Sequence, residues 1–226
     1  IKFINNKVII NRLEKTISQV IVAESMILMG YVSSLFINKY NIAAPFRIQK
    51  LNCNSSEILN RFKDSEIKYI ILKQYMGRSF ITTKPGNHES LGLKMYVQCT
   101  SPLRRYLDLV IQRQIYNKIN NYENLCINSV SKIIDYSKIR QTENNNIIKN
   151  DKFKYLKLLF MNDKKPFYKI IFVKWINHKR NIALVYFPDY SLEILITLFV
   201  SIEIYSNKIY KVKYIINDSN LLEFIY

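Results

Sequence analysis

The chain has 226 residues, 49% of them hydrophobic, which is enough for one large domain or for a moderate domain with a small one beside it. It carries 34 Lys and Arg against 17 Asp and Glu, and this formal net charge of +17 favours a polyanionic partner such as nucleic acid. The three cysteines are widely spaced and form no CxxC pair, which argues against a zinc site and against a secreted disulfide framework.

The sequence predicts no membrane span and no leader. The longest apolar run, Ile194–Ile202, is shorter than the roughly 20 residues that a membrane-spanning helix needs. No signal or transit peptide is recognisable, and because the chain begins with Ile1 we expect a fragment or a non-standard start. Ile, Lys, Asn and Tyr are abundant, which is typical of an A+T-rich genome and explains part of the positive charge.

The N-terminal segment predicts the end of a strand at Val8–Ile10 and then a helix at Leu13–Tyr40. One apolar stripe of this helix is expected to be buried, and it consists of Ile17, Val20, Ile21, Glu24, Ile27, Leu28, Tyr31 and Leu35. Glu24 is unusual there, because a buried carboxylate without a partner costs about several kcal/mol. Two interpretations stay open: Glu24 contacts a ligand hydroxyl, or it is a buried partner of an arginine or a backbone N–H.

Between residues 41 and 98 the pattern breaks into short segments: a helix at Ser55–Phe62 capped by Asn54 or Ser55, an apolar but ambiguous stretch at Ile67–Met76, and a loop at Thr82–His88. His88 in this loop is typical of a surface residue that forms hydrogen bonds. A helix is expected to start at Cys99–Pro102, because Ser or Thr is a favoured cap and Pro suits the first helical position.

Arg104 and Arg105 fall in the expected first turn of that helix. Free backbone N–H groups and the positive end of the helix dipole would add to the two guanidinium groups, which together make a phosphate site. The alternative is an ion pair between Arg104 and Asp108 on a solvated face. On the residues alone the two interpretations have equal weight.

The C-terminal part of the chain predicts a helix and then a small barrel. The helix covers Ser129–Phe160, with an interruption at Glu143–Asn146. Five short strand-like segments follow, which is the size of an OB-fold barrel: Tyr168–Trp175, Ile182–Phe187, Leu192–Tyr205, Ile209–Ile216 and Leu221–Tyr226. We place the domain boundary near Lys164. Lysines alternate with aromatic residues in these strands, which indicates either an RNA-stacking surface or core aromatics beside solvated lysines.

Several motifs resemble the ribonuclease II-type (RNB) family of exoribonucleases, in particular its cyanobacterial and plastid branch. The longest is Thr-Ser-Pro-Leu-Arg-Arg-Tyr-Leu-Asp-Leu at Thr100–Leu109. The others are Val-Ala-Glu-Ser-Met-Ile-Leu at Val22–Leu28, Pro-Phe-Arg-Ile-Gln at Pro45–Gln49, Pro-Gly-Asn-His at Pro85–His88 and Leu-Gly-Leu-Lys-Met-Tyr at Leu91–Tyr96. The similarity covers roughly residues 1–160, and the barrel agrees with the family by architecture.

This resemblance implies an α+β fold: the mostly helical C-terminal part of an RNB catalytic domain in residues 1–164, followed by a five-stranded OB-like RNA-binding barrel in residues 165–226. It implies hydrolysis of single-stranded RNA from the 3′ end to nucleoside monophosphates. Arg104 would be catalytic at the scissile phosphate, and Glu24 would bind ribose hydroxyls. The other residues implied to bind substrate are Arg105, Tyr96, His88 and Arg47.

Two departures from the family pattern affect the expected function. The family holds Mg²⁺ with clustered aspartates, and the seven aspartates of this chain are dispersed, so no metal site is expected within the chain. A family Glu-Arg pair is also missing near Ile147. We therefore expect a chain that is inactive by itself and joins an N-terminal RNB half carrying the aspartates. The alternative is a catalytically inactive RNA-binding or structural protein of an organellar ribonucleoprotein. The composition and the branch resembled suggest a plastid location.

Overall fold

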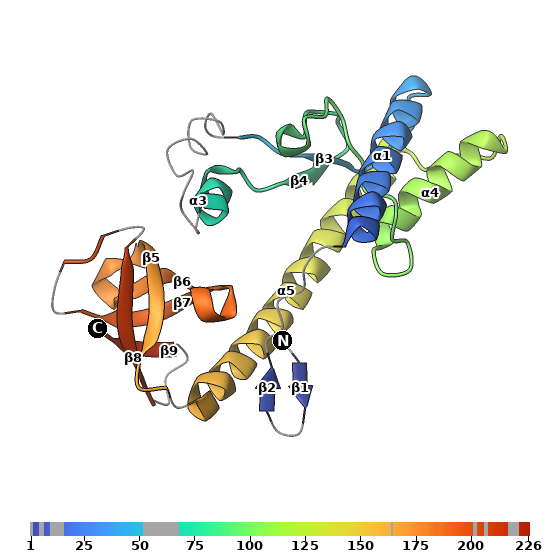
Figure 1. The fold of residues 1–226 in the computed structure, drawn as a ribbon. Helices are drawn as coiled ribbons and strands as arrows, with labels where there is room; N and C mark the ends of the chain where they lie inside the picture. Colours follow the sequence, from blue (N-terminus) through green and yellow to red (C-terminus); the bar gives the residue numbers. More distant parts are fainter. Residues whose placement is uncertain are drawn as a thin grey trace. The chain divides into compact units, whose positions relative to one another are not determined.

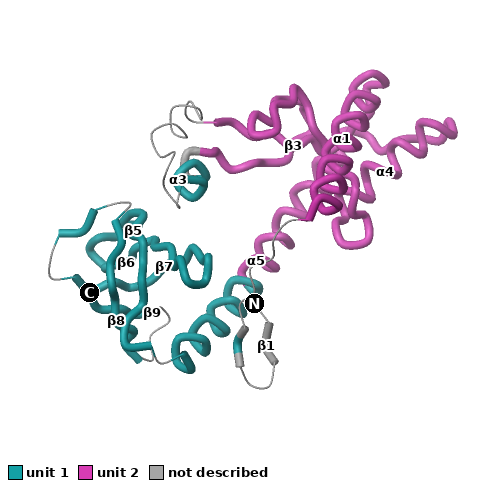
Figure 2. The backbone as a smooth tube through the Cα atoms, viewed as in Figure 1, with its two compact units in different colours: residues 1–13, 55–73, 147–226 teal, residues 14–54, 74–146 magenta. Residues whose placement is uncertain are grey.

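The computed structural model describes residues 2–4, 7–9, 16–51, 68–163, 165–200, 203–205, 208–216 and 222–226. They fall into two compact units (Figure 2). We call residues 14–54 and 74–146 the helical unit, and residues 1–13, 55–73 and 147–226 the barrel unit. The helix expected at Ser55–Phe62 lies outside the described residues.

The helical unit contains two complete helices, the first part of a third and a two-stranded sheet (Figure 1). Helix α1, Ile17–Lys39, begins with a capping box, in which Thr16 and Gln19 each accept a hydrogen bond from the other's backbone N–H. Strand β3, Phe46–Ile48, pairs antiparallel with β4, Phe80–Thr82. The short 3₁₀ helix η1, Glu89–Leu91, and helix α4, Tyr106–Ile119, follow. Their buried core consists of Ile37, Ile42, Ala44, Phe46, Val97, Cys99 and Ile111.

The predicted buried stripe of α1 is wrong in this chain. The buried residues of the helix are Gly30, Ser33, Ser34 and Ile37. In the predicted stripe, by contrast, Ile17 is 82% exposed and Ile21 and Leu28 are each 61% exposed. The helix is apolar on both sides, and the side that packs is the one whose small residues let another segment come close. A Cβ at Gly30 would lie only 2.4 Å from the Tyr96 ring and from the carbonyl oxygen of Val97.

Helix α4 starts later than expected, at Tyr106 with Arg105 as its cap residue. Pro102–Arg104 form a turn instead, because the backbone N–H groups of Arg104 and Arg105 both donate to the carbonyl oxygen of Ser101. The carboxylate of Asp108 fixes this turn by accepting a hydrogen bond from the N–H of Ser101 at 2.9 Å. A side chain from the first helical turn therefore replaces the expected Ser or Thr cap.

Helix α5, Ile127–Asp163, is continuous, so the predicted interruption at Glu143–Asn146 is wrong. The polar run contains neither Pro nor Gly, and an ion pair between Arg140 and Glu143 at 3.1 Å supports the helix where the run begins. The ambiguous stretch Ile67–Met76 contains helix α3, Lys68–Tyr75. Strands β1, Lys2–Ile4, and β2, Lys7–Ile9, form a hairpin, which confirms strand structure at Val8 and Ile9.

The barrel unit contains the five predicted strands, closed into a barrel in the order β5-β6-β7-β9-β8 (Figure 1). Their bounds are Tyr168–Asn177, Ile182–Phe187, Leu192–Phe199, Ile209–Ile215 and Leu222–Ile225 for β5, β6, β7, β8 and β9. All neighbouring pairs are antiparallel except β7 with β9. Strand β7 ends at Phe199, earlier than predicted. The α+β class is confirmed, and the boundary near residue 164 stays a prediction.

Aromatic rings fill the barrel core. Phe160, from the end of α5, lies at its centre and contacts Tyr168, Phe187, Tyr214 and Phe224, with ring centroids 5.1–5.7 Å apart. Tyr168, Phe187 and Phe224 are at most 1% exposed. Rings packed at these distances add to the stability that the burial of their apolar area provides. The end of α5 is therefore part of the barrel core.

Candidate functional site

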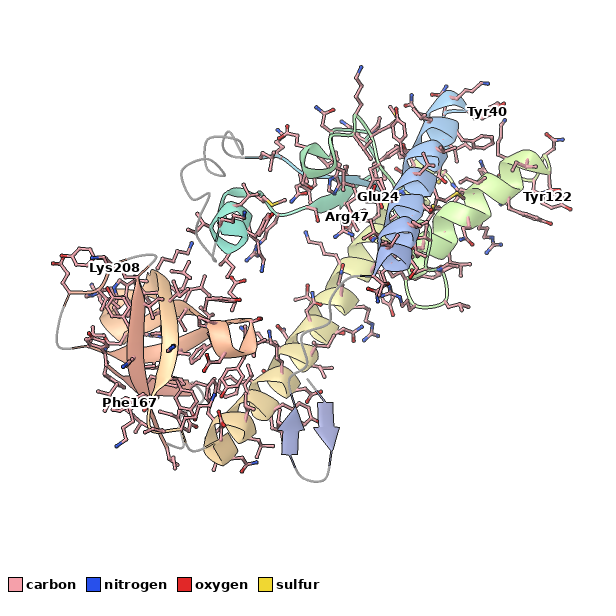
Figure 3. All side chains as sticks on the ribbon, viewed as in Figure 1. Glu24, Tyr40, Arg47, Tyr122, Phe167 and Lys208 are labelled. Carbon is pink, nitrogen blue, oxygen red and sulfur yellow. The ribbon has the colours of Figure 1, made fainter. Side chains whose placement is uncertain are left out.

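Arg47 on β3 is held by side chains from two other segments. Its Nε donates to Ser79 Oγ at 3.1 Å, and its Nη1 donates to Gln98 Oε1. Its backbone N–H donates to the carbonyl oxygen of Tyr96 at 2.9 Å. Figure 3 labels Arg47 on β3 and Glu24 on α1, both in the helical unit. A partly buried guanidinium fixed at these points keeps one orientation, which suits the binding of an anion.

His88 is buried, with 7% of its surface exposed, so the interpretation as a surface residue is wrong. Its ring meets the Tyr96 ring edge-on at 5.4 Å, and its Nδ1 lies 3.3 Å from Ser90 Oγ. Burial lowers the pKa of His88 below 6.5, and the positive charge of Arg47 lowers it further. The histidine is therefore held neutral beside the arginine.

Tyr96 connects the parts of this cluster. It is 8% exposed, and burial raises the pKa of its phenol above the ordinary value of 10.0. The charges of Arg47 and Arg105 lower that pKa and the charge of Asp108 raises it, so all three lie close enough to act on the phenol. The structure thus brings together four of the six predicted site residues: Arg47, His88, Tyr96 and Arg105.

Arg105 is bound to Asp108. Its Nε and Nη2 lie 2.8 and 2.7 Å from Asp108 Oδ2, while the side chain of Asp108 is only 2% exposed. The predicted alternative, an ion pair of Arg104 with Asp108, is wrong because Arg105 occupies that carboxylate. The turn directs the two side chains differently. Arg105 is held by the buried carboxylate of Asp108, and Arg104 extends into solvent.

Arg104 is exposed at the tip of this turn, and its side chain has no hydrogen bond or ion pair within the described part of the chain. Its neighbour Leu103 is fully exposed. Glu24 is exposed as well, which overturns the expectation that it lies in a core. The interpretation of Glu24 as a buried partner of an arginine or a backbone N–H is therefore wrong, and its carboxylate is accessible on α1.

The barrel presents lysines on its outer surface. Lys169 on β5 and Lys211 on β8 are direct cross-strand partners, and Lys213 lies two residues further along the same face. All three are exposed. Like charges directly opposite one another destabilise a sheet, so this strip favours an anionic ligand. The aromatic residues between the lysines are mainly core: Tyr168, Phe172 and Tyr210 are buried.

The acidic side chains that could hold Mg²⁺ are dispersed over the described part of the chain. Among the described residues, no group of three or more His, Cys, Asp and Glu side chains is placed to hold a metal ion. Asp108, the best-buried carboxylate near the arginines, is already used by Arg105 and by the N–H of Ser101. Asp108 is therefore engaged in the fold and is not free to bind a hard cation.

Sequence reasoning missed the residues that hold this cluster in place. Asp108 was considered only as a partner of Arg104, and Gln98 and Ser79 were not considered at all. Gln114 is fully buried and joins two loops by binding the carbonyl oxygens of Ala43 and Leu125 at 2.8 and 3.0 Å. The position of Gln98 between the motifs that carry Tyr96 and Thr100 was a sequence signal for a role at the site. Its partner Arg47 on β3 could not be predicted, because the two residues are far apart in the sequence.

Comparisons with known proteins all indicate ribonucleases. The model of the RNB domain matches residues 2–121. An uncharacterised ribonuclease of Synechocystis is 27% identical over 183 residues, which covers 80% of this chain and 28% of the relative. The mitochondrial exoribonuclease II of Saccharomyces cerevisiae is 32% identical over 127 residues, covering 51% of this chain and 13% of the relative. This chain therefore spans less than a third of either relative.

The fold matches a solved structure as well. Mycoplasma genitalium RNase R in complex with ribose-methylated single-stranded RNA superposes with a TM-score of 0.73 at 16% identity. The match covers 95% of this chain and 42% of that protein. At this identity the likeness shows the fold, and both the helices and the barrel take part in it.

Proposed function

Because the chain belongs to the RNB domain family, we propose that it forms the RNA-binding C-terminal part of an exoribonuclease that degrades single-stranded RNA from the 3′ end to nucleoside monophosphates. The observation that carries the proposal is the turn Ser101–Arg105, which holds Arg105 on Asp108 and leaves Arg104 exposed. A guanidinium at the scissile phosphate offsets the negative charge that develops during phosphoryl transfer. Arg104 is the residue assigned to that role.

Glu24 is proposed to recognise the sugar. Its exposed carboxylate can accept hydrogen bonds from ribose hydroxyls, and the 2′-hydroxyl is the group that distinguishes RNA from DNA. Arg47 and Arg105 are assigned to the phosphates, since both guanidinium groups are fixed by neighbouring side chains. His88 and Tyr96 are more than nine-tenths buried, which supports a part in substrate binding through the position of Arg47.

The carboxylates of the reaction are proposed to come from the part of the RNB domain that precedes this sequence in relatives, whether in the same polypeptide or in a separate one. That part would hold Mg²⁺. This chain would contribute Arg104, the sugar contact and the lysine strip of the barrel. The 226 residues by themselves are then expected to bind RNA and to leave it intact.

The test uses a 5′-labelled single-stranded RNA and Mg²⁺ with the 226-residue chain, alone and mixed with the acid-bearing RNB half. We expect binding without cleavage for the chain alone, and stepwise release of monophosphates from the mixture. Arg104→Ala should abolish the release, while Arg113→Ala, an exposed arginine on α4, should leave it unchanged. Cleavage by the chain alone that is lost in Arg104→Ala would overturn the assignment of the metal site to another part.

A second candidate function is a catalytically inactive RNA-binding or structural protein. It is favoured by the lack of an acidic cluster among the described residues and by the missing Glu-Arg pair near Ile147. A mixture that binds RNA but releases no monophosphate would support this second function. For the location, a cyanobacterial and a mitochondrial relative support an organelle, and the plastid is our proposal.

A further inference from the structure

A pocket lies in the helical unit between the end of α1 and the loop that joins α4 to α5. Its volume is about 390 Å³, which falls within the range of roughly 300–1,000 Å³ that is typical of small-molecule sites. Figure 3 labels Tyr40 at the end of α1 and Tyr122 in the loop after α4. Apolar side chains form part of the lining, and they include Ile37, Phe46 and Leu125.

The buried side chain of Gln114 joins two walls of this pocket. Gln114 is fully buried on α4, and its Nε2 donates to the carbonyl oxygen of Ala43 at 2.8 Å. The same amide exchanges two hydrogen bonds with the backbone of Leu125, at 3.0 and 2.9 Å. Ala43 and Leu125 both line the pocket. Because these walls are tied together by the fold, little ordering is left for a ligand to impose.

Asn124 places an unpaired hydrogen-bond acceptor at the pocket. Its side-chain oxygen Oδ1 is buried and has no hydrogen-bond partner within the described part of the chain. The residues on both sides of it are held, Leu125 by Gln114 and the carbonyl oxygen of Glu123 by Asn117 at 2.8 Å. A buried acceptor without a donor is unfavourable. A ligand that offers an N–H or O–H group to Asn124 would remove this cost.

Positive charge lies beside the same pocket. Lys118, near the end of α4, lines the pocket, and its Nζ lies 5.4 Å from the centroid of the Tyr40 ring. Lys39 Nζ lies 5.4 Å from the same centroid. A tyrosine ring attracts ammonium groups, so Tyr40 keeps both lysines near the pocket. The described residues that line it include no Asp or Glu, and the pocket therefore favours an anionic group.

These three features define the chemistry of a ligand. The ligand needs an apolar body for the walls, an N–H or O–H donor for Asn124, and a negative charge for Lys118. Inorganic phosphate has the charge without the apolar body, and a nucleoside has the body and the donor without the charge. A nucleoside monophosphate combines all three, because its base has apolar faces and carries N–H groups and its phosphate is anionic.

We propose that this pocket binds a nucleoside monophosphate, with the phosphate at Lys118 and an N–H group of the base at Asn124. The choice of a nucleotide rests on the proposed function, which releases this class of product. The pocket is separate from the arginine turn. Arg104 precedes the start of α4 and Lys118 lies near its end, so that about 18 Å of helix separate them.

The first experiment titrates adenosine 5′-monophosphate (AMP) into the 226-residue chain by isothermal titration calorimetry. Adenosine and inorganic phosphate are titrated in parallel. We expect AMP to bind about tenfold or more tightly than either of them, because each lacks one part of the ligand. Inorganic phosphate that binds as tightly as AMP would overturn the proposal, since it would show a general attraction of anions. Adenosine that binds as tightly as AMP would overturn the role of Lys118.

Matched variants locate the binding. Lys118→Ala should weaken the binding of AMP by about tenfold, whereas Lys138→Ala, at an exposed position of α5 in the same unit, should leave it within about twofold. Asn124→Leu should weaken it by about tenfold as well. Arg104→Ala should leave it within about twofold, and a loss of AMP binding in this variant would overturn the proposal in favour of the arginine turn.

Cys126 gives a second readout at the pocket itself. It is exposed and lines the pocket, and a hydrogen bond with Ser129 lowers the pKa of its thiol below 9.0, which favours the reactive thiolate. In a Cys53→Ser background, with Cys99 buried, saturating AMP should slow maleimide labelling of Cys126 by about tenfold. Unchanged labelling would overturn the proposal. Protection by a single-stranded oligonucleotide but not by AMP would also overturn it, in favour of an RNA segment.

The two measurements separate this inference from the proposed function. Binding of AMP that depends on Lys118, together with no RNA cleavage by the completed mixture, would support the pocket and contradict the exoribonuclease activity. Cleavage by that mixture without protection of Cys126 by AMP would support the activity and overturn the pocket.

Discussion

Arg105 Nη2 lies 2.7 Å from Asp108 Oδ2, and this ion pair fixes the turn on which Arg104 is displayed. Asp108 is 2% exposed and also accepts a hydrogen bond from the N–H of Ser101. A single carboxylate in the first turn of α4 therefore binds both Ser101 of the Thr-Ser-Pro segment and Arg105, the cap residue of that helix. The exposed arginine owes its position to its bound neighbour.

Asp108→Asn should destabilise the fold, since it removes the charge from a buried hydrogen-bonded pair and keeps the side-chain shape. We expect the free energy of unfolding to fall by about 2 kcal/mol, measured by urea denaturation. Asp135→Asn on the exposed surface of α5 is the control and should change it by less than about 0.5 kcal/mol. Equal effects of the two substitutions would contradict the anchoring role of Asp108.

The buried His88 should make stability depend on pH. Burial and Arg47 lower its pKa in the folded state below 6.5, so the unfolded chain binds the proton more readily. The stabilising contribution is fully present above pH 6.5 and is lost as the pH falls below it, through the folded-state pKa. Measured unfolding free energies from pH 8 to pH 5 should fall less steeply in His88→Gln than in the parent chain. His178→Gln, at an exposed position, should keep the parent slope.

Gly30→Ala should destabilise the helical unit, although alanine favours a helix by about 1 kcal/mol. The added Cβ would lie 2.4 Å from the Val97 carbonyl oxygen, a backbone atom that cannot move aside by rotation. We expect a net loss of about 1–3 kcal/mol in thermal or urea unfolding. Gly86→Ala should cost less, because its Cβ meets only the flexible side chain of Ile48. A higher melting temperature for Gly30→Ala would refute the close packing of α1 on Tyr96.

The lysine strip should account for part of the salt dependence of RNA binding. Lys169 and Lys211 are direct cross-strand partners, and their simultaneous change to Ala should remove about two phosphate contacts. The slope of log K against log salt should then become shallower by about 1.4 for single-stranded RNA. Lys179→Ala with Arg180→Ala, in the turn between β5 and β6, is the matched double control. If both double variants change the salt slope equally, then the net charge of the chain, and not the position of the lysine strip, determines the binding of RNA.

Much of the fold could be predicted because its signals are local. Alternating apolar residues and turn residues predicted the five strands of the barrel. The capping box of Thr16 with Gln19 was not predicted, although the two residues have the required spacing. The motif at Thr100–Leu109 indicates the family from the sequence alone, and the match of the RNB domain model to residues 2–121 confirms it. The start of α4 was mispredicted, because Asp108 reaches back to Ser101 and replaces a local cap.

The sequence by itself determined that α1 is helical and apolar, that five strands follow, and that the chain carries a large positive charge. Only the tertiary structure decided which side of α1 is covered and which arginine is free. The physical reason is that a helix apolar on both sides has no preferred face until a neighbour packs against it, and here Gly30, Ser33 and Ser34 admit the segment Met95–Cys99. Likewise, two adjacent arginines are equivalent in sequence until the buried Asp108 binds one of them and leaves the other in solvent.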